Sequence, residues 1–102
     1  MIELFILFTL CLTQAGCKRL VGDECTADAQ CGDGRVCDLL SEGGYCTLSP
    51  CERGACPEES ICVLFENRQS FCMVTCQSTD DCREGYLCDE ATGVAPFCRQ
   101  SE

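Results

Sequence analysis

The stretch CQSTDDCREGYLCDEATGVAPFC, residues 76–98, contains four cysteines separated by 5, 5 and 9 residues. Two upstream stretches have nearly the same spacing, with gaps of 5, 5 and 8 residues between Cys25 and Cys46 and of 4, 5 and 9 residues between Cys51 and Cys72. An aromatic residue stands directly before the last cysteine of every stretch, at Tyr45, Phe71 and Phe97. Self-similarity at a fixed period indicates a repeated structural unit. The sequence therefore predicts three four-cysteine modules in tandem.

Each module is expected to contain one short β-hairpin between its third and fourth cysteines, and little helix, because no stretch shows a sustained helical period of apolar residues. The expected strand segments are residues 35–40 with 45–48, 61–65 with 71–74, and 86–89 with 96–99. The outer modules place a glycine three residues after their second cysteine, at Gly34 and Gly85, where the middle module has Glu59. A turn that depends on a glycine with positive φ must therefore be built differently in the middle module.

Cysteine accounts for 14 of the 102 residues, well above the roughly 8–10 % that marks a disulfide scaffold in a short secreted chain. A chain of this length buries too little apolar surface to offset its conformational entropy alone. Each disulfide adds about 2–4 kcal/mol by restricting the unfolded chain. Disulfides persist in oxidising compartments, so the sequence predicts an exported, small disulfide-rich protein.

Twelve cysteines are expected to pair within their modules: Cys25, Cys31, Cys37, Cys46, Cys51, Cys56, Cys62, Cys72, Cys76, Cys82, Cys88 and Cys98. Four cysteines allow three pairings in each module, and the sequence alone leaves all three open. We favour pairing of the first cysteine with the third and of the second with the fourth. Such interlocking bridges tie the leading loop of a module to its hairpin, whereas sequential pairing leaves the two halves independent.

The N-terminal segment has the features of a secretory signal peptide. Residues 4–12, LFILFTLCL, are an apolar run that is much shorter than the roughly 20 residues of a membrane-spanning helix. The small residues Ala15 and Gly16 follow, directly before Cys17. We therefore predict a signal peptide over residues 1–16.

The residues around this site also resemble the lipobox of bacterial lipoproteins, in which two small residues precede a cysteine that becomes acylated. The resemblance implies a diacylglyceryl group on Cys17, which would be the mature N-terminus. The alternative to a lipobox is a plain secretory signal whose cleavage site happens to precede a structural cysteine. Cleavage before Cys17 leaves thirteen cysteines, an odd number, and acylation of Cys17 leaves twelve that can pair. The expected organisation is a signal peptide (1–16), a lipidated tether (17–24) and three cysteine-rich modules (25–50, 51–75 and 76–102).

The outer modules share the pattern Cys-x5-Cys-x2-Gly-x2-Cys, at Cys25, Cys31, Gly34 and Cys37 and at Cys76, Cys82, Gly85 and Cys88. This pattern resembles the Dickkopf N-terminal and EB-type cysteine-rich repeats. Together with the lipobox-like start, residues 17–102 resemble the short cysteine-rich lipoproteins of Gram-negative bacteria. The resemblance implies membrane anchoring through acyl chains on Cys17. It also implies the outer membrane, on its periplasmic or surface side, because Lys18 is not the aspartate associated with inner-membrane retention.

No catalytic, cofactor or metal site is expected. The chain has no histidine, so Ser-His-Asp and Cys-His arrangements cannot form within it. Thiols that are bridged in disulfides are not available as thiolate ligands. The acidic residues between Asp80 and Asp89 do not match an EF-hand calcium loop, and we expect a solvated acidic face. A net charge of −10 argues against nucleic acid as a partner.

The middle hairpin carries the strongest indication of a partner protein. Its segments 61–65 and 71–74 have apolar residues on both faces, and a small module covers only one. We expect the other face to pack on a neighbouring module or to contact a partner, with Leu64, Phe65 and Met73 as candidate contact residues. The favoured function is a non-enzymatic, lipid-anchored protein-interaction or display module. The alternatives are a freely secreted disulfide-rich inhibitor or effector and a passive structural spacer.

Overall fold

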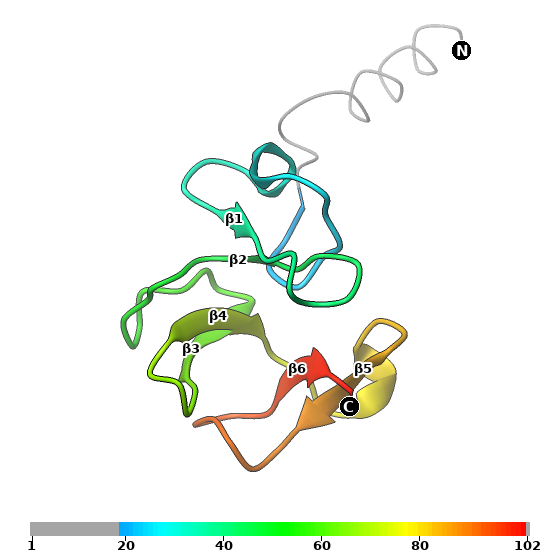
Figure 1. Cartoon of the computed structure of the whole chain (residues 1–102). Coiled ribbons are helices and arrows are strands. Elements are labelled where there is room, and N and C mark those ends of the chain that lie inside the picture. The colour runs from blue at the N-terminus through cyan, green and yellow to red at the C-terminus, as the bar shows by residue number, and fades with distance from the viewer. Residues whose placement is uncertain (1–18, 102) are drawn as a thin grey trace, which may run out of the picture.

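Residues 19–101 are described by the computed structural model, and they form three two-stranded antiparallel sheets (Figure 1). The hairpins are β1 (Val36–Cys37) with β2 (Cys46–Thr47), β3 (Ser60–Leu64) with β4 (Ser70–Val74), and β5 (Tyr86–Asp89) with β6 (Phe97–Gln100). Within these residues, helix is limited to two short 3-10 turns, η2 (Asp28–Cys31) and η3 (Thr79–Asp81). The predicted small disulfide-rich fold of hairpins with little helix is confirmed. The predicted signal peptide and Cys17 lie outside the described residues.

Six disulfides interlock in the predicted way, first cysteine to third and second to fourth. The pairs are Cys25–Cys37, Cys31–Cys46, Cys51–Cys62, Cys56–Cys72, Cys76–Cys88 and Cys82–Cys98. The third and fourth cysteines of each hairpin stand directly opposite each other across the two strands, as Cys62 and Cys72 do in the middle hairpin. Opposed residues point to the same face of a hairpin. Both bridges of a unit therefore clamp its leading loop onto one face of its hairpin.

The same turn leads into all three hairpins, but it is built in two ways. The backbone N–H groups of Arg35, Ser60 and Tyr86 donate to the carbonyls three residues earlier, at 3.2, 2.9 and 3.0 Å. In the outer units the third residue of this turn is a glycine with positive φ, 75° at Gly34 and 89° at Gly85. Glu59 occupies that place in the middle unit and does not have a positive φ. The expectation of a different turn in the middle unit is confirmed.

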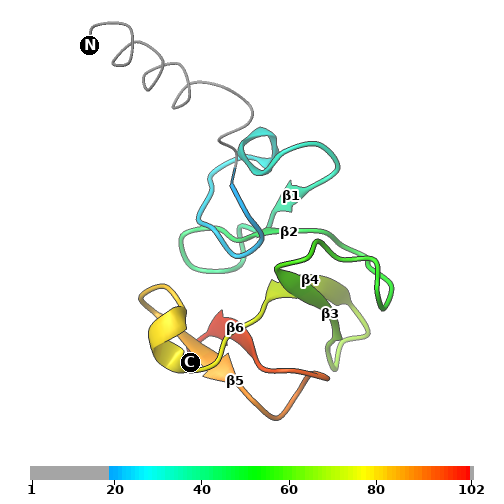
Figure 2. The ribbon, with the colours of Figure 1, turned by 180° about the vertical axis from the view of Figure 1, so that it is seen from behind.

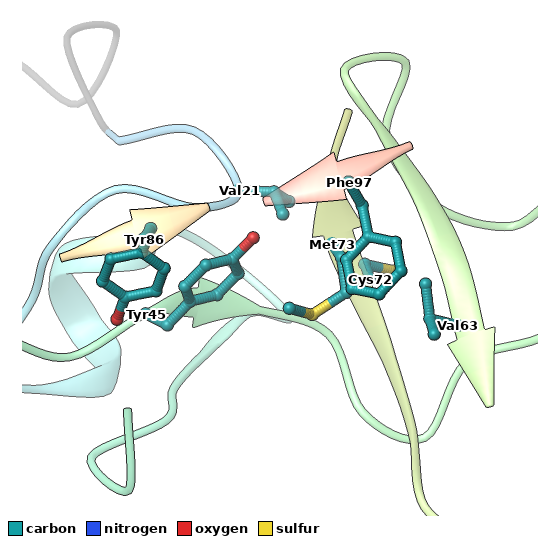
Figure 3. Close-up of a cluster of buried hydrophobic side chains, with 7 residues drawn as sticks. All are labelled: Val21, Tyr45, Val63, Cys72, Met73, Tyr86 and Phe97. Atoms are coloured by element: carbon teal, nitrogen blue, oxygen red, sulfur yellow. The ribbon is translucent and has the colours of Figure 1, made fainter. Parts of the chain in front are cut away.

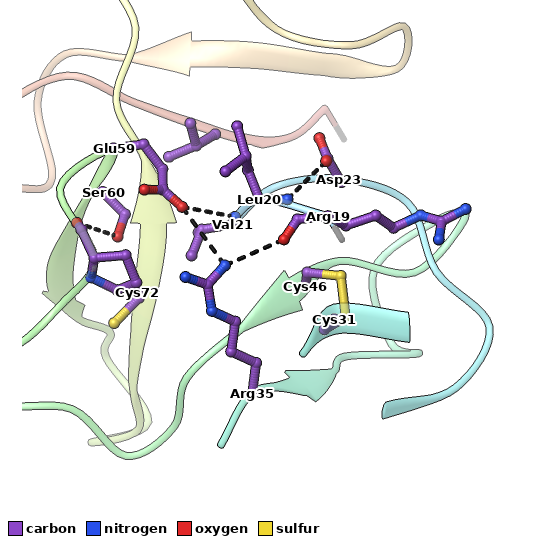
Figure 4. A network of polar contacts seen from close by, with 12 residues as sticks. Arg19, Leu20, Val21, Asp23, Cys31, Arg35, Cys46, Glu59, Ser60 and Cys72 are labelled. Carbon is purple, nitrogen blue, oxygen red and sulfur yellow. Dashed lines mark hydrogen bonds and ion pairs between the residues drawn. A yellow bond between two sulfur atoms is a disulfide. The ribbon is translucent and has the colours of Figure 1, made fainter. Parts of the chain in front are cut away.

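The departure at Glu59 joins the first two units. Its carboxylate accepts a hydrogen bond from the backbone N–H of Val21 at 3.1 Å and lies 3.7 Å from the guanidinium of Arg35 (Figure 4). The same guanidinium donates to the carbonyl of Arg19 at 3.3 Å. A glycine at position 59 has no side chain with which to make these contacts. The residue that breaks the sequence repeat thus holds the segment before the first unit against the middle unit.

Replacing Glu59 with glycine is expected to destabilise the oxidised protein by about 1–3 kcal/mol, because the backbone N–H of Val21 loses its acceptor and Arg35 loses its partner. The ion pair is partly exposed and contributes at most about 1 kcal/mol of this loss. Denaturant unfolding measures the difference. Glu58→Gly is the matched control, since Glu58 is exposed and carries the same backbone entropy cost without these contacts. If the two variants lost the same free energy of unfolding, the contacts of the Glu59 side chain would not contribute to stability.

The first hairpin is shorter than predicted. Segments 35–40 and 45–48 were expected to pair, but only two residues pair on each side. The backbone N–H of Asp38 still donates to the carbonyl of Tyr45 at 2.9 Å. The prediction was wrong for residues 39–40 because the Asp38 carboxylate accepts hydrogen bonds from the backbone N–H of Leu40 at 3.0 Å and from the hydroxyl of Ser41 at 3.3 Å. These bonds turn the chain away from the partner strand. The turn continues through Gly44, where a β-carbon would collide with the carbonyl of Cys25.

One apolar core is shared by the three hairpins (Figure 3). Its buried members are Val21, Tyr45, Val63, Cys72, Met73, Tyr86 and Phe97. The hydroxyl of Tyr45 donates to the carbonyl of Cys98 at 3.2 Å and accepts from the N–H of Val74 at 3.0 Å, so one side chain of the first unit bonds both others. In both ribbon views the first hairpin lies across the other two, with β2 beside β4 and β4 beside β6 (Figures 1 and 2). The hairpins therefore form a single body.

No helix among residues 19–101 has the length and apolar character needed to cross a bilayer.

Candidate interaction groove

Two adjoining recesses lie between the hairpins: one of about 420 Å³ where all three meet, and one of about 540 Å³ between the second and third. Both are lined by Phe65, Asn67 and Arg99, so they are treated as one feature, the inter-hairpin groove. The apolar residues of the first recess are Leu40, Tyr45, Phe65, Phe71 and Met73. Its uncharged polar residues are Ser41, Thr47, Asn67, Gln69, Gln100 and Ser101. The groove combines apolar walls with amide and hydroxyl groups that can bond a peptide backbone.

The structure places all three predicted contact residues at this groove. Met73 lines the first recess, and it is a core residue with only 8 % of its surface exposed. Phe65 is half-buried and lines both recesses. Leu64 is 68 % exposed and lines the second recess. The cross-strand register places Met73 and Leu64 on opposite faces of the middle hairpin. Met73 packs against the neighbouring hairpins, and Leu64, on the face of Cys62 and Cys72, is exposed to solvent.

Leu40 is the groove residue that the sequence analysis missed. It is 95 % exposed and lines the first recess. Leu40 was expected at the end of the strand segment 35–40, and an apolar residue in a strand is usually interpreted as a core residue. The signal that could have found it is the pair Leu39-Leu40 directly before Ser41-Glu42-Gly43-Gly44, because apolar residues beside a glycine turn lack a strand to bury them.

The wall between the two recesses is held by aromatic packing. The Phe65 ring meets the rings of Phe71 and Phe97 edge-on, each with centroids 6.0 Å apart. The guanidinium of Arg99 lies over the Phe65 ring, 5.5 Å from its centroid, and pairs with Asp89 at 3.0 Å. Phe65 is thus packed on two sides by side chains from β4 and β6.

Asp89 is fixed as a structural carboxylate. Its oxygens accept hydrogen bonds from the N–H of Ala91 at 2.8 Å, from the hydroxyl of Thr92 at 2.7 Å and from Arg99. Burial alone would raise the pKa of Asp89, but these hydrogen bonds outweigh burial and hold the pKa well below its usual value. Asp89 is therefore ionised at neutral pH and neutralises Arg99 at the edge of the groove.

Other acidic residues cap backbone groups in the same way. Asp28 accepts from the N–H of Cys37 at 2.8 Å, and Asp81 accepts from the N–H groups of Gln77 and Ser78 at 2.8 and 3.2 Å. In the described part of the chain, the side chains close enough to share a metal ion are all cysteines, and each of these is bridged in a disulfide. Asp81 and Asp89, which belong to the acidic run between Asp80 and Asp89, thus accept hydrogen bonds from backbone N–H and hydroxyl groups.

Arg83 joins the third unit to the first on the far side of Tyr45. Its guanidinium lies 4.3 Å from the ring centroid of Tyr86 and 5.8 Å from that of Tyr45. It donates to the carbonyl of Gly22 at 2.9 Å, to that of Glu42 at 2.6 Å and to that of Gly44. The hydroxyl of Tyr86 donates to the same Glu42 carbonyl at 2.8 Å. These contacts fix the loop that carries Leu40.

The two tyrosines report on this packing through their ionisation. Burial raises the pKa of Tyr45 to about 12 and also raises the pKa of Tyr86, although Arg83 acts in the opposite direction on both. These are the only tyrosines of the chain, which has no tryptophan, so phenolate absorbance reports on them alone.

A rapid pH jump of the oxidised protein, followed by phenolate absorbance, is expected to show ionisation at a higher pH than the value near 10 of an exposed tyrosine, with Tyr45 ionising near pH 12. Because both phenols ionise more easily when the chain is unfolded, their contribution to stability is complete below about pH 10, and the part that comes from Tyr45 is lost as the pH rises toward 12. The reduced, unfolded chain is the control and should titrate near pH 10. A step near pH 10 in the oxidised protein would mean that the tyrosines are exposed and the hairpins are not packed together.

Comparison with protein-family models, with curated proteins and with solved structures finds no match for this chain.

Proposed function

We propose that the chain is a non-enzymatic, lipid-anchored envelope or surface protein that presents the inter-hairpin groove to another protein. The supporting observation is that the groove walls come from three hairpins, each tied by two disulfides and all joined through one core. Six disulfides in so short a chain are typical of an exported protein. A surface fixed in this way loses little conformational entropy when a partner binds, which favours affinity.

The chemistry of the groove favours binding over catalysis. Its ionisable side chains include Asp38, which caps Leu40 and Ser41, and Arg99, which pairs with Asp89. Both are engaged in holding the local structure. Glu66, at the second recess, is an exposed carboxylate, and the residues that remain are apolar or carry amides and hydroxyls, which recognise a ligand but are not the usual general acids and bases.

The lipid anchor is supported by the count of thiols. The twelve cysteines of the described residues are all bridged among themselves. The sequence holds 14 cysteines, and the other two are Cys11, in the proposed signal peptide, and Cys17. Cys17 is thus left for acylation in the mature chain. Two or more acyl chains give stable membrane binding, whereas one does not.

Intact-mass analysis of the protein from its native host tests the anchor. The expected species starts at Cys17, carries the mass of acyl chains, and gains two hydrogens per bridge for six bridges upon reduction. A mature chain with unmodified Cys17 would favour the freely secreted inhibitor or effector. Chemical cross-linking in the same host tests the contact function, and a protein that cross-links to nothing would favour the passive spacer.

A further inference from the structure

We infer that the inter-hairpin groove receives a segment of a partner protein in which an apolar side chain is flanked by lysine or arginine. The inference rests on the proposed function and names the chemistry of the partner. Its support comes from the exposed leucines at the two recesses, the rigidity of the loop that carries one of them, and the carboxylates that line the groove.

Exposed apolar side chains line both recesses of the groove. Leu40 contributes to the first and is 95 % exposed, Leu64 contributes to the second and is 68 % exposed, and Phe65 lines both recesses. A single exposed leucine on a protein surface is ordinary. An exposed leucine at each of two recesses that share an aromatic residue is an apolar patch of the kind that marks contact sites. The complementary contact on the partner is an apolar side chain.

The loop that carries Leu40 is held in its exposed position. The Asp38 carboxylate bonds the N–H of Leu40, and the side chain of Gln100 accepts from the N–H of Glu42 at 3.0 Å. The carbonyl of Glu42 in turn accepts from Arg83 and from Tyr86. Contacts from the third unit thus anchor the loop on the side after Leu40, and Asp38 anchors it on the side before. A loop fixed before binding presents Leu40 at little entropic cost.

The charged residues that line the groove indicate which residues flank the apolar side chain of the partner. Asp38 lines the first recess and Glu66 the second. Arg99 is the cation among the lining residues of either recess, and Asp89 neutralises it at 3.0 Å. Arg68, at the neighbouring loop tip, does not line the groove. The groove is therefore negative on a chain with a net charge of −10, and complementary charge on a partner is cationic.

Site-specific photo-cross-linking in the native host tests this inference on the full-length protein. A benzophenone side chain replaces Leu40, and in a matched protein it replaces Leu20, which is 55 % exposed and lines a different recess. Each is combined with Glu66→Lys or with Glu52→Lys. Both changes alter the net charge equally, and both residues are exposed, but Glu52 does not line the groove.

The expected result is a discrete protein adduct from position 40 that falls about five-fold with Glu66→Lys and is nearly unchanged with Glu52→Lys. The cross-linked peptide of the partner should contain lysine or arginine next to the attachment site. An adduct to lipid or to a second copy of the chain overturns the inference, as does an equal response to the two charge changes. A protein adduct from position 40 that responds equally to the two charge changes leaves the proposed function standing, whereas a protein adduct from position 20 alone places the contact outside the groove and overturns both. No adduct from either position counts against the proposed function as well.

Discussion

Replacing Phe97 with alanine is expected to destabilise the oxidised protein by about 3–5 kcal/mol. Phe97 has none of its surface exposed and packs edge-on against Phe65. Its backbone also bridges Thr75, next to the middle hairpin. The variant leaves a cavity between the second and third hairpins, where the clamped backbone can collapse only in part. Denaturant unfolding with the disulfides intact measures the loss.

The matched control for Phe97→Ala is Leu64→Ala. Leu64 is also apolar and lies in the middle hairpin, but it is 68 % exposed. Its removal should change the free energy of unfolding by no more than about 0.5 kcal/mol. A loss below about 1 kcal/mol for Phe97→Ala would mean that the disulfides alone hold the fold and that the shared core adds little.

Replacing Arg83 with alanine is expected to cost about 2–4 kcal/mol and to release the loop that carries Leu40. The guanidinium donates to three carbonyls of the first unit, at Gly22, Glu42 and Gly44, and stacks on Tyr86. Without the guanidinium, the three carbonyls would need hydrogen bonds from water at a half-buried site. Denaturant unfolding measures the loss of stability. The backbone N–H of Glu42 donates a hydrogen bond to the side chain of Gln100, and faster hydrogen exchange at this N–H would show that the loop is released.

Two further variants separate the roles of Arg83. Arg83→Lys keeps the charge but lacks the planar fork, so it should recover less than half of the lost stability. Arg53→Ala removes an exposed arginine with the same change in net charge and should leave stability unchanged. If Arg83→Ala and Arg53→Ala behaved alike, the first and third units would not be joined through this side chain.

The hairpins, and the confinement of the bridges to single modules, could be predicted from the cysteine spacing. Gaps of 4 to 9 residues recur three times, and such a pattern involves only residues that are close in the chain. The spacing left three pairings open in each module, and interlocked pairing was favoured because it ties the leading loop to the hairpin. The replacement of glycine by Glu59 also predicted a different turn, although the sequence did not reveal that its carboxylate reaches Val21.

The packing of the hairpins against one another could not be predicted in this way. It depends on contacts between residues far apart in the chain, such as Arg83 with Gly22, which are 61 positions apart, and Tyr45 with Cys98, which are 53 apart. Spacing within a module carries no information about such pairs. Leu40 was missed for a different reason, because the strand pattern did not reveal the local turn that the Asp38 carboxylate makes two residues before it.

Native-state hydrogen exchange of the oxidised protein tests most directly whether the hairpins form one body. We predict that the slowest amides of β2, β4 and β6 open with a common free energy and that Phe97→Ala lowers this value by the same amount in all three strands. Separate opening energies for the three hairpins, with Phe97→Ala affecting β6 alone, would contradict a shared core and with it a groove built from all three.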